Sequence, residues 1–130
     1  MIVLDASAII ELLLGTPRGL RVADALDDNT QAVHVPHLAD VEVAHVLRRM
    51  VAEKVIDGRT GGEAVEELQN LPLVRHGHNA MLDRIWSLRD NLTAYDAAYV
   101  ALAEVLDATL LTCDKRFART AKRTARVEVM

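Results

Sequence analysis

The chain has 130 residues, of which 51% are hydrophobic and 3% are aromatic, and its formal net charge is -4. This length suffices for one domain with a buried core, and we expect a single domain over residues 1–130. The few aromatic residues argue against a base-stacking platform, and the single cysteine, Cys113, excludes an internal disulfide and a cysteine-rich zinc site. No leader peptide or membrane-spanning stretch is recognisable, so we expect a cytoplasmic protein.

The first half of the chain predicts two strands and four helices. A β-branched run at residues 2–4 is followed by a helix through Leu14, which Gly15-Thr16-Pro17 ends. Pro17 suits the first turn of the next helix. Asp57-Gly58 predicts a turn, and Thr60 with Glu63 predicts a capping box for the fourth helix. The remaining expected elements are a helix over 17 to about 29, a strand over 32–35, a helix over about 37–54 and a helix from 60 to about 70.

The second half continues the alternation of short apolar strands and helices. The expected elements are a strand over 71–75, a helix over about 78–89, a helix from 91–93 through 106, a strand over 109–112, a helix from about 114 and an edge strand over 127–129. This succession predicts an α/β fold with three layers, in which helices flank a central, mostly parallel sheet of four to five strands.

Four acidic residues stand at positions that this fold brings toward one edge. Asp5 and Asp114 directly follow predicted strands, and Glu42 and Asp96 lie in the first turns of predicted helices. Ligands of parallel α/β sheets bind outside the carboxyl ends of the strands. Carboxylates held together there need a proton or a cation between them, and a divalent metal held by carboxylates indicates phosphoryl chemistry.

Capping explains three of these acids without any catalytic role. Asp5 and Asp114 each stand where a helix N-cap is expected, and Asp96 follows Thr93 at capping-box spacing. Glu42 fits this explanation least, because Leu38 and Val46 stand one turn before and after it on the same helix row. A carboxylate that points toward apolar neighbours needs a partner.

Two hydroxyl side chains and a basic segment complete the candidate site. Ser7 and Thr112 could orient Asp5 or a metal-bound water, and no GxSxG motif surrounds Ser7 to make it a nucleophile. Residues 115–126 contain six basic residues and no acid, which is compatible with holding a phosphate backbone or with an ordinary solvated helix face. The five histidines match no common zinc pattern.

The segments that carry the four acids resemble those of PIN-domain ribonucleases, and most closely the VapC-type toxins of toxin–antitoxin pairs. The resemblance lies in Val-Leu-Asp5-Ala-Ser-Ala, in residues 36–42 followed by Val-Ala-His-Val-Leu-Arg-Arg, in Thr93-Ala-Tyr-Asp96-Ala-Ala-Tyr and in Leu-Thr-Cys-Asp114. These segments occur in the family's order across about 110 residues, and together they make a specific signal.

The resemblance implies a PIN-like fold and an endoribonuclease dependent on Mg²⁺, with Mn²⁺ as a substitute. Asp5, Glu42, Asp96 and Asp114 would be catalytic residues and metal ligands. The resemblance also implies a homodimer and a VapB-like antitoxin whose tail covers the acidic site. Some relatives carry a further acid after the fourth, where this chain has Lys115 and Arg116, so the number of metal ions stays open. Together with Arg119, these two residues are candidates for contact with the RNA backbone.

Three other functions use similar acidic pockets. A metal-dependent phosphatase with Asp5 as nucleophile would usually carry a second aspartate two residues later, where this chain has Ser7. A receiver-like domain would have an aspartate at the end of a middle strand, and residues 71–75 are followed by none. A non-catalytic binding module would not need all four acids.

Overall fold

The computed structural model of the chain describes residues 1–28 and 31–130. Five strands lie within these ranges: β1 (Ile2–Leu4), β2 (Val33–Pro36), β3 (Leu73–His76), β4 (Thr109–Thr112) and β5 (Arg126–Val129). The helices are α1 (Ala6–Leu14), α2 (Pro17–Asp27), α3 (Leu38–Ala52), α4 (Gly58–Asn70), α5 (Leu82–Ser87), α6 (Ala94–Leu106) and α7 (Lys115–Ala121). A short 3-10 helix, η1 (Asn79–Met81), precedes α5.

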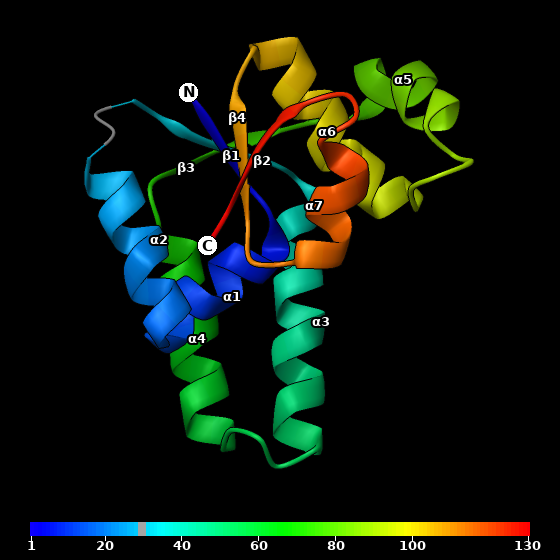
Figure 1. The fold of residues 1–130 in the computed structure, drawn as a ribbon. Coiled ribbons are helices and arrows are strands. Elements are labelled where there is room, and N and C mark those ends of the chain that lie inside the picture. The colour runs from blue at the N-terminus through cyan, green and yellow to red at the C-terminus, as the bar shows by residue number, and fades with distance from the viewer. Residues whose placement is uncertain (29–30) are drawn as a thin grey trace.

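The strands form one sheet in the order β3-β2-β1-β4-β5, and every neighbouring pair is parallel. The prediction of a mostly parallel sheet of four to five strands is thereby confirmed. From β1 the chain builds the sheet outward through β2 and β3, then returns to place β4 on the other side of β1 (Figure 1). The order therefore reverses between β1 and β4, and such a switch point opens a crevice at the carboxyl ends of the two strands.

The helices cover both faces of the sheet. Crossovers between parallel strands are right-handed, which places α1 to α4 on one face and α5 to α7 on the other. α6 packs on β1, β2 and β4, and α1 packs on β4 and on α2, α3 and α4. The α3–α4 pair extends well past the edge of the sheet as a long hairpin (Figure 1).

The core lies in the central strands and in α6. Residues 97–103 of α6 are all buried, and four of them are alanines, which allow the helix to lie close to the sheet. Val3 and Leu4 of β1 and Leu110 and Leu111 of β4 are also almost fully buried. Each such aliphatic side chain contributes roughly 1.5–3 kcal/mol relative to an exposed position. The two strands that carry Asp5 and Asp114 are thus the most firmly held part of the sheet.

Two glycines shape the connection between α1 and α2. Gly15 ends α1 in the left-handed conformation, with φ of 63°, which glycine adopts without steric cost. A Cβ atom on Gly19 would lie 1.9 Å from the carbonyl oxygen of Glu11, so only glycine permits the observed approach of the two helices. Thr16 caps α2 by accepting a hydrogen bond from the backbone N–H of Gly19.

Two predicted helix boundaries are wrong. α4 begins at Gly58 rather than at Thr60, because the carboxylate of Asp57 accepts a hydrogen bond from the Thr60 N–H at 2.7 Å and serves as the N-cap. The helix predicted over about 78–89 is divided into η1 and the six-residue α5. Only Met81 and Ile85 of these two elements are buried, so tertiary packing supports little helix there.

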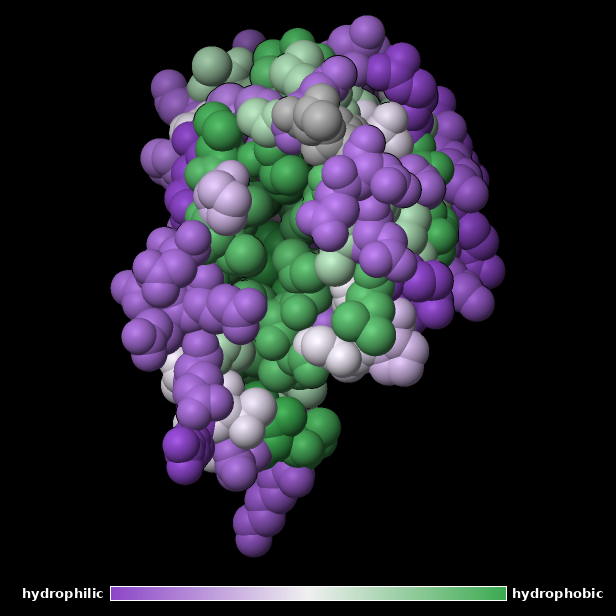
Figure 2. All heavy atoms as spheres, turned by 90° about the vertical axis from the view of Figure 1, so that its left-hand side faces the viewer, coloured by the Kyte–Doolittle hydropathy of each residue, from purple (hydrophilic) through white to green (hydrophobic). Residues whose placement is uncertain are grey.

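The other boundaries agree within a few residues. The predicted end of the second helix near Asn29 lies outside the described residues, and α2 is described as far as Asp27. No helix in the described ranges has the length and apolar character needed to cross a membrane. Figure 2 views the molecule from the side on which α2 lies and shows a hollow lined by apolar residues between hydrophilic rims.

Candidate active site

Asp5 and Asp114 flank the switch point of the sheet. Asp5 follows β1 and Asp114 follows β4, and the Asp5 N–H donates to the Leu111 carbonyl at 3.2 Å. Both residues are also helix N-caps: Asp5 accepts from the Ala8 N–H at 3.1 Å and Asp114 from the Phe117 N–H at 3.0 Å. Each cap occupies one carboxylate oxygen, so capping and a role in a site are compatible.

Ser7 and Thr112 hold the Asp5 carboxylate from two sides. The Ser7 hydroxyl donates to Oδ1 of Asp5 at 2.7 Å, and the Thr112 hydroxyl donates to Oδ2 at 2.8 Å. Each hydroxyl in turn accepts a backbone N–H from the segment after β4, from Cys113 for Ser7 and from Asp114 for Thr112, both at 3.0 Å. The carboxylate of Asp5 is therefore fixed in orientation and tied to the backbone that carries Asp114.

The pKa of the Asp5 carboxyl is raised. Its side chain is buried, and burial raises its pKa from 3.8 to about 6. The hydrogen bonds from Ser7, Ala8 and Thr112 oppose this rise, and the negative charge of Asp114 adds to it. The three hydrogen-bond donors thus lower the pKa of Asp5 by less than burial and the neighbouring carboxylate raise it.

Glu42 and Asp96 reach the same edge from opposite layers, Glu42 from α3 and Asp96 from α6. Burial raises the pKa of Glu42, and the carboxylates of Asp96 and Asp5 raise it further. Burial and then Asp114 raise the pKa of Asp96, against a lowering contribution from the Thr93 hydroxyl. The four acids that the sequence singled out thus act on one another electrostatically.

Glu42 contains an unsatisfied buried atom. Its Oε1 is buried without a hydrogen-bond partner, and so is the hydroxyl of Tyr99, which lies one turn after Asp96 on α6. The Tyr99 hydroxyl is near enough to lower the pKa of Glu42, yet it makes no hydrogen bond of normal geometry. A buried carboxylate oxygen without a donor destabilises the protein by an amount that a bound cation could offset.

Among the described residues, no basic side chain forms an ion pair with any of these four acids. The ion pairs of the described residues involve Glu11, Asp40, Glu63, Glu104 and Asp107, and none of the four site acids. Within the same ranges, no three His, Cys, Asp or Glu side chains are already grouped to hold a metal ion. The oxygen donors and the orphaned Glu42 atom fit a hard divalent cation, with water completing its shell.

The basic residues of α7 begin directly after Asp114. Lys115, Arg116 and Arg119 are exposed, and in the part of the chain that the structure describes none of them forms an ion pair. Arg126, from the same basic segment, is bound instead to Asp107. Lys115, Arg116 and Arg119 therefore place three cations on α7, which begins directly after Asp114.

Sequence reasoning missed two residues next to this site. Tyr99 stands three residues after Asp96, and that helical spacing was a usable signal. Arg18 donates to the Cys113 carbonyl at 3.3 Å and to the Glu11 carboxylate at 2.8 Å, so it ties the segment after β4 to α1 and α2. Arg18 and Cys113 are 95 residues apart, and no local pattern indicates their contact.

Asp40, His34 and His76 have partners that join elements of the fold. Asp40 accepts two hydrogen bonds from Arg75, at 2.8 and 3.1 Å, which joins α3 to β3. The rings of His34 and His76 meet through Nδ1 and Nε2 at 2.8 Å across the β2–β3 pair. These contacts hold elements together and contribute no group to the acidic edge.

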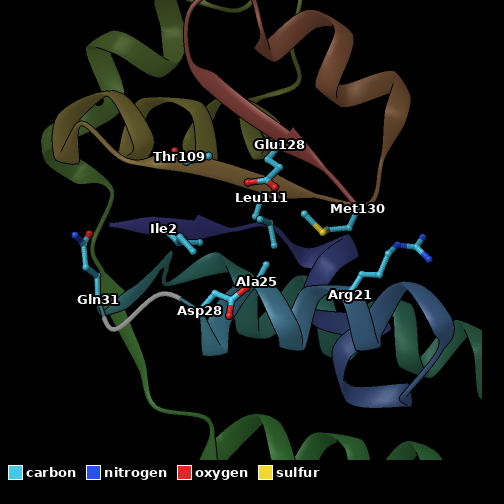
Figure 3. Close-up of a pocket in the computed structure, with 9 residues that line it drawn as sticks. All are labelled: Ile2, Arg21, Ala25, Asp28, Gln31, Thr109, Leu111, Glu128 and Met130. Carbon is cyan, nitrogen blue, oxygen red and sulfur yellow. The ribbon is translucent and has the colours of Figure 1, made fainter.

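A separate hollow of about 640 Å³ lies between α2 and the sheet (Figure 3). Arg21 and Ala25 of α2, and Asp28 directly after it, line the hollow together with strand residues that include Leu111 and Glu128. None of the four acids lines this hollow, which is therefore distinct from the acidic edge of the sheet.

Comparison with known proteins places these features in a family. The family model described as "PIN domain" matches residues 2–123. Ribonuclease VapC12 of Mycobacterium tuberculosis is 42% identical over 130 residues, covering 100% of this chain and 99% of the relative. Ribonuclease VapC9 of the same species is 39% identical over 132 residues, covering 100% and 98%.

Solved structures share the fold at low sequence identity. The crystal structure of Mycobacterium tuberculosis VapC20, described as a sarcin–ricin loop cleaving toxin, has a TM-score of 0.69 and 15% sequence identity, and the match covers 92% of this chain and 94% of that one. At this identity the match supports the architecture of the sheet and helices alone.

Proposed function

The chain belongs to the PIN domain family, and on this premise we propose that it is a metal-dependent endoribonuclease that acts as the toxin of a toxin–antitoxin pair. Relatives of nearly the same length bear the name ribonuclease, and one protein of the same fold is described as a toxin that cleaves the sarcin–ricin loop. PIN-domain nucleases generally depend on a divalent metal.

One observation carries the proposal. Asp5, Glu42, Asp96 and Asp114 lie toward the carboxyl edge of β1 and β4 and act on one another electrostatically, and none of them has an ion-pair partner among the described residues. The pKa values of Asp5, Glu42 and Asp96 are raised first by burial and then by neighbouring carboxylates. Acids that form no ion pair with an arginine or lysine of the described residues remain available to bind a metal cation.

We assign Mg²⁺, with Mn²⁺ as a substitute, to Asp5, Asp96 and Asp114, with Glu42 as a ligand or a contact through water. Mg²⁺ commonly binds through one or two carboxylates and keeps several waters. This mode of binding suits these acids, because no three of them in the described residues are closely grouped. When bound, such an ion supplies an activated water and offsets the charge that develops on a phosphate. Ser7 and Thr112 would keep the Asp5 carboxylate in the orientation that this requires.

The RNA backbone would be held beside the acids by α7. Lys115, Arg116 and Arg119 are exposed cations that follow directly on Asp114, and phosphates are their natural ligands. In-line attack of water on the phosphodiester would leave a 5′-phosphate and a 3′-hydroxyl. The carboxylates would thus hold the metal at the reacting phosphate, and the cations of α7 would bind the neighbouring phosphates.

The proposed partners follow from the same site. A VapB-like antitoxin would cover the acids with its tail, and a basic side chain of that tail could neutralise the carboxylates that otherwise attract the metal. We also propose that the protein is a cytoplasmic homodimer, as the family resemblance implies. The phosphatase alternative is weaker, because such enzymes carry a second aspartate where this chain has Ser7, whose hydroxyl donates a hydrogen bond to Asp5.

Cleavage of a mixed RNA pool tests the proposal. The antitoxin-free protein is incubated with Mg²⁺ or Mn²⁺, with EDTA, and as the Asp96→Asn variant. Asp90→Asn is the matched control, because Asp90 is an exposed aspartate between α5 and α6. Cutting that requires the metal, is lost in Asp96→Asn and persists in Asp90→Asn is the expected result. Cutting that survives EDTA and Asp96→Asn would overturn the proposal.

A further inference from the structure

A second hollow, of about 460 Å³, opens beside the acidic site between α3 and α6. Its lining residues are Leu38, Val41, Glu42, His45, Val46 and Tyr95. α3 and α6 lie on opposite faces of the sheet, so this hollow lies at the edge of the sheet where the layers meet. That edge is the one that carries the four acids.

The hollow and the acidic site share a residue. Glu42 lines the hollow and is also electrostatically coupled to Asp5 and Asp96. On each helix the acid adjoins a lining residue: Val41 precedes Glu42 on α3, and Tyr95 precedes Asp96 on α6. An RNA strand with one phosphate at the acids therefore has an adjacent nucleotide at the mouth of the hollow.

The lining of the hollow suits a flat, uncharged ring better than a phosphate. Leu38, Val41 and Val46 form an apolar wall, and Glu42, the carboxyl group of the lining, would repel an anion. Val41 is 72% exposed and Tyr95 is 64% exposed, so both side chains are open to solvent at the hollow. The Tyr95 ring is thus available for stacking, and His45 can exchange hydrogen bonds with the edge of a base.

We propose that this hollow binds an unpaired nucleobase adjacent to the phosphate that is cut, with Tyr95 as the stacking residue that contributes to base preference. This inference rests on the proposed nuclease function and adds to it a subsite for one base beside the phosphate that is cut. The low aromatic content excludes a platform of several rings, but a single well-placed ring can hold a single base. The phosphates of the same strand would then run toward α7.

A cycle that combines protein and substrate changes tests the proposal. The substrate is a short RNA containing a site that the wild type cuts in the mixed pool, together with versions that lack the base at one flanking position at a time. Wild type, Tyr95→Ala and Tyr95→Phe are compared by kcat/KM. Trp86→Ala is the matched control, since Trp86 is 68% exposed and lies on α5 outside the lining of the hollow.

One abasic position is expected to slow the wild type by roughly 5- to 150-fold, the range for loss of one stacked base. Tyr95→Ala should lose a similar factor on intact RNA and little more on that abasic RNA, whereas Tyr95→Phe and Trp86→Ala should behave like the wild type. Equal losses by Tyr95→Ala on both RNAs would overturn the subsite while leaving the nuclease function intact. Equal losses together with a change from dimer to monomer in sedimentation would instead assign Tyr95 to contact with a second copy, which also overturns it.

Binding in EDTA separates the subsite from cleavage altogether. RNAs of the same sequence that carry 2-aminopurine at each flanking position in turn report stacking through quenching of its fluorescence. Quenching at one position by wild type and Tyr95→Phe, but not by Tyr95→Ala, supports the subsite even if no RNA is cut and the nuclease proposal fails. Quenching at that position that is unchanged in Tyr95→Ala would overturn the subsite.

Discussion

Two groups of carboxylates in this molecule have opposite surroundings. On the outer surfaces, acids such as Asp40, Glu104 and Glu11 each lie within 2.8 Å of an arginine. At the carboxyl edge of β1 and β4, Asp5, Glu42, Asp96 and Asp114 face one another without such a partner among the described residues. Among the described residues, acids that join two elements thus have an arginine partner, and the acids at the carboxyl edge of β1 and β4 have none.

Acids of the first group join two elements through an ion pair, and acids of the second group are positioned by the surrounding structure without one. The Arg84–Glu104 pair joins α5 to α6 with bonds of 2.8 and 2.9 Å, and its loss would affect only that contact. Asp5, in contrast, is buried and receives three donors, yet its pKa is still raised to about 6. A surplus of negative charge that the surrounding structure maintains is a property expected of a cation site.

Removing one carboxylate of the site should give the largest effect. We expect Asp5→Asn to reduce RNA cleavage in Mg²⁺ by roughly a thousand-fold, the upper part of the range for loss of one electrostatic stabiliser of a reacting group. Glu104→Gln, which breaks an outer ion pair, should leave cleavage within a factor of about two, since it lies outside the field of the site. Rates measured on one RNA substrate check both variants, and equal losses in both would remove the distinction between the two groups.

The pH dependence of stability should distinguish the two groups next. Asp5 has a raised pKa, so the folded state holds this proton more tightly than the unfolded state does, and stability falls as pH rises from about 4 to about 6. The shift from 3.8 to about 6 corresponds to roughly 3 kcal/mol at most. In metal-free protein, the stability of Asp5→Asn relative to wild type should therefore increase by up to that amount between pH 4 and pH 7.

Urea unfolding in EDTA at several pH values measures this difference. Asp90→Asn serves as the control, because it removes an exposed aspartate and should show a flat difference from wild type. Added Mg²⁺ should raise the stability of wild type at pH 7 more than that of Asp5→Asn, since the ion binds the ionised carboxyl. A constant difference between Asp5→Asn and wild type across this pH range would contradict the raised pKa of Asp5.

The two hydroxyls that orient Asp5 should have an intermediate effect. Ser7→Ala removes the donor to Oδ1 of Asp5 and Thr112→Val removes the donor to Oδ2. Each should weaken metal affinity or cleavage by about 10- to 100-fold, as is usual for groups that orient a ligand. Mn²⁺ binding by calorimetry and cleavage rates check the prediction, and Ser87→Ala, on the exposed face of α5, is the matched hydroxyl control. Unchanged Mn²⁺ affinity and cleavage in both variants would show that the hydroxyls do not control the orientation of Asp5.

The outer ion pairs should give the smallest effect. Asp40→Asn removes the charge that faces Arg75, and the two side chains are 38% and 27% exposed. Pairs that are open to solvent contribute about 0–1 kcal/mol, so we expect a loss of stability within this range and no loss of cleavage. Thermal unfolding and a cleavage assay on the same samples measure both quantities. A large loss of cleavage would contradict the prediction and assign Asp40 to the acidic site.

Much of the architecture follows from local patterns in the chain. Short apolar runs alternating with helices predict a parallel α/β sheet, and the residues after the first and fourth strands, Asp5 and Asp114, are then placed at its carboxyl edge. The boundaries of α4 and α5 could not be predicted in this way. Asp57 and Thr60 both offer a cap for α4, and the extent of α5 depends on burial of Met81 and Ile85 by distant parts of the chain.

The order of the elements and the acids that stand at their ends follow from local patterns in the chain, because periodicity and capping act over a few residues. The reversal of strand order between β1 and β4, and the burial of Glu42 Oε1 without a hydrogen-bond partner, depend on packing in three dimensions. The tertiary structure also determines that Thr112 bonds to Asp5 across 107 residues and that Val41 and Tyr95 line one hollow. These features depend on how the layers pack on the sheet, and no local spacing encodes the distance between two layers.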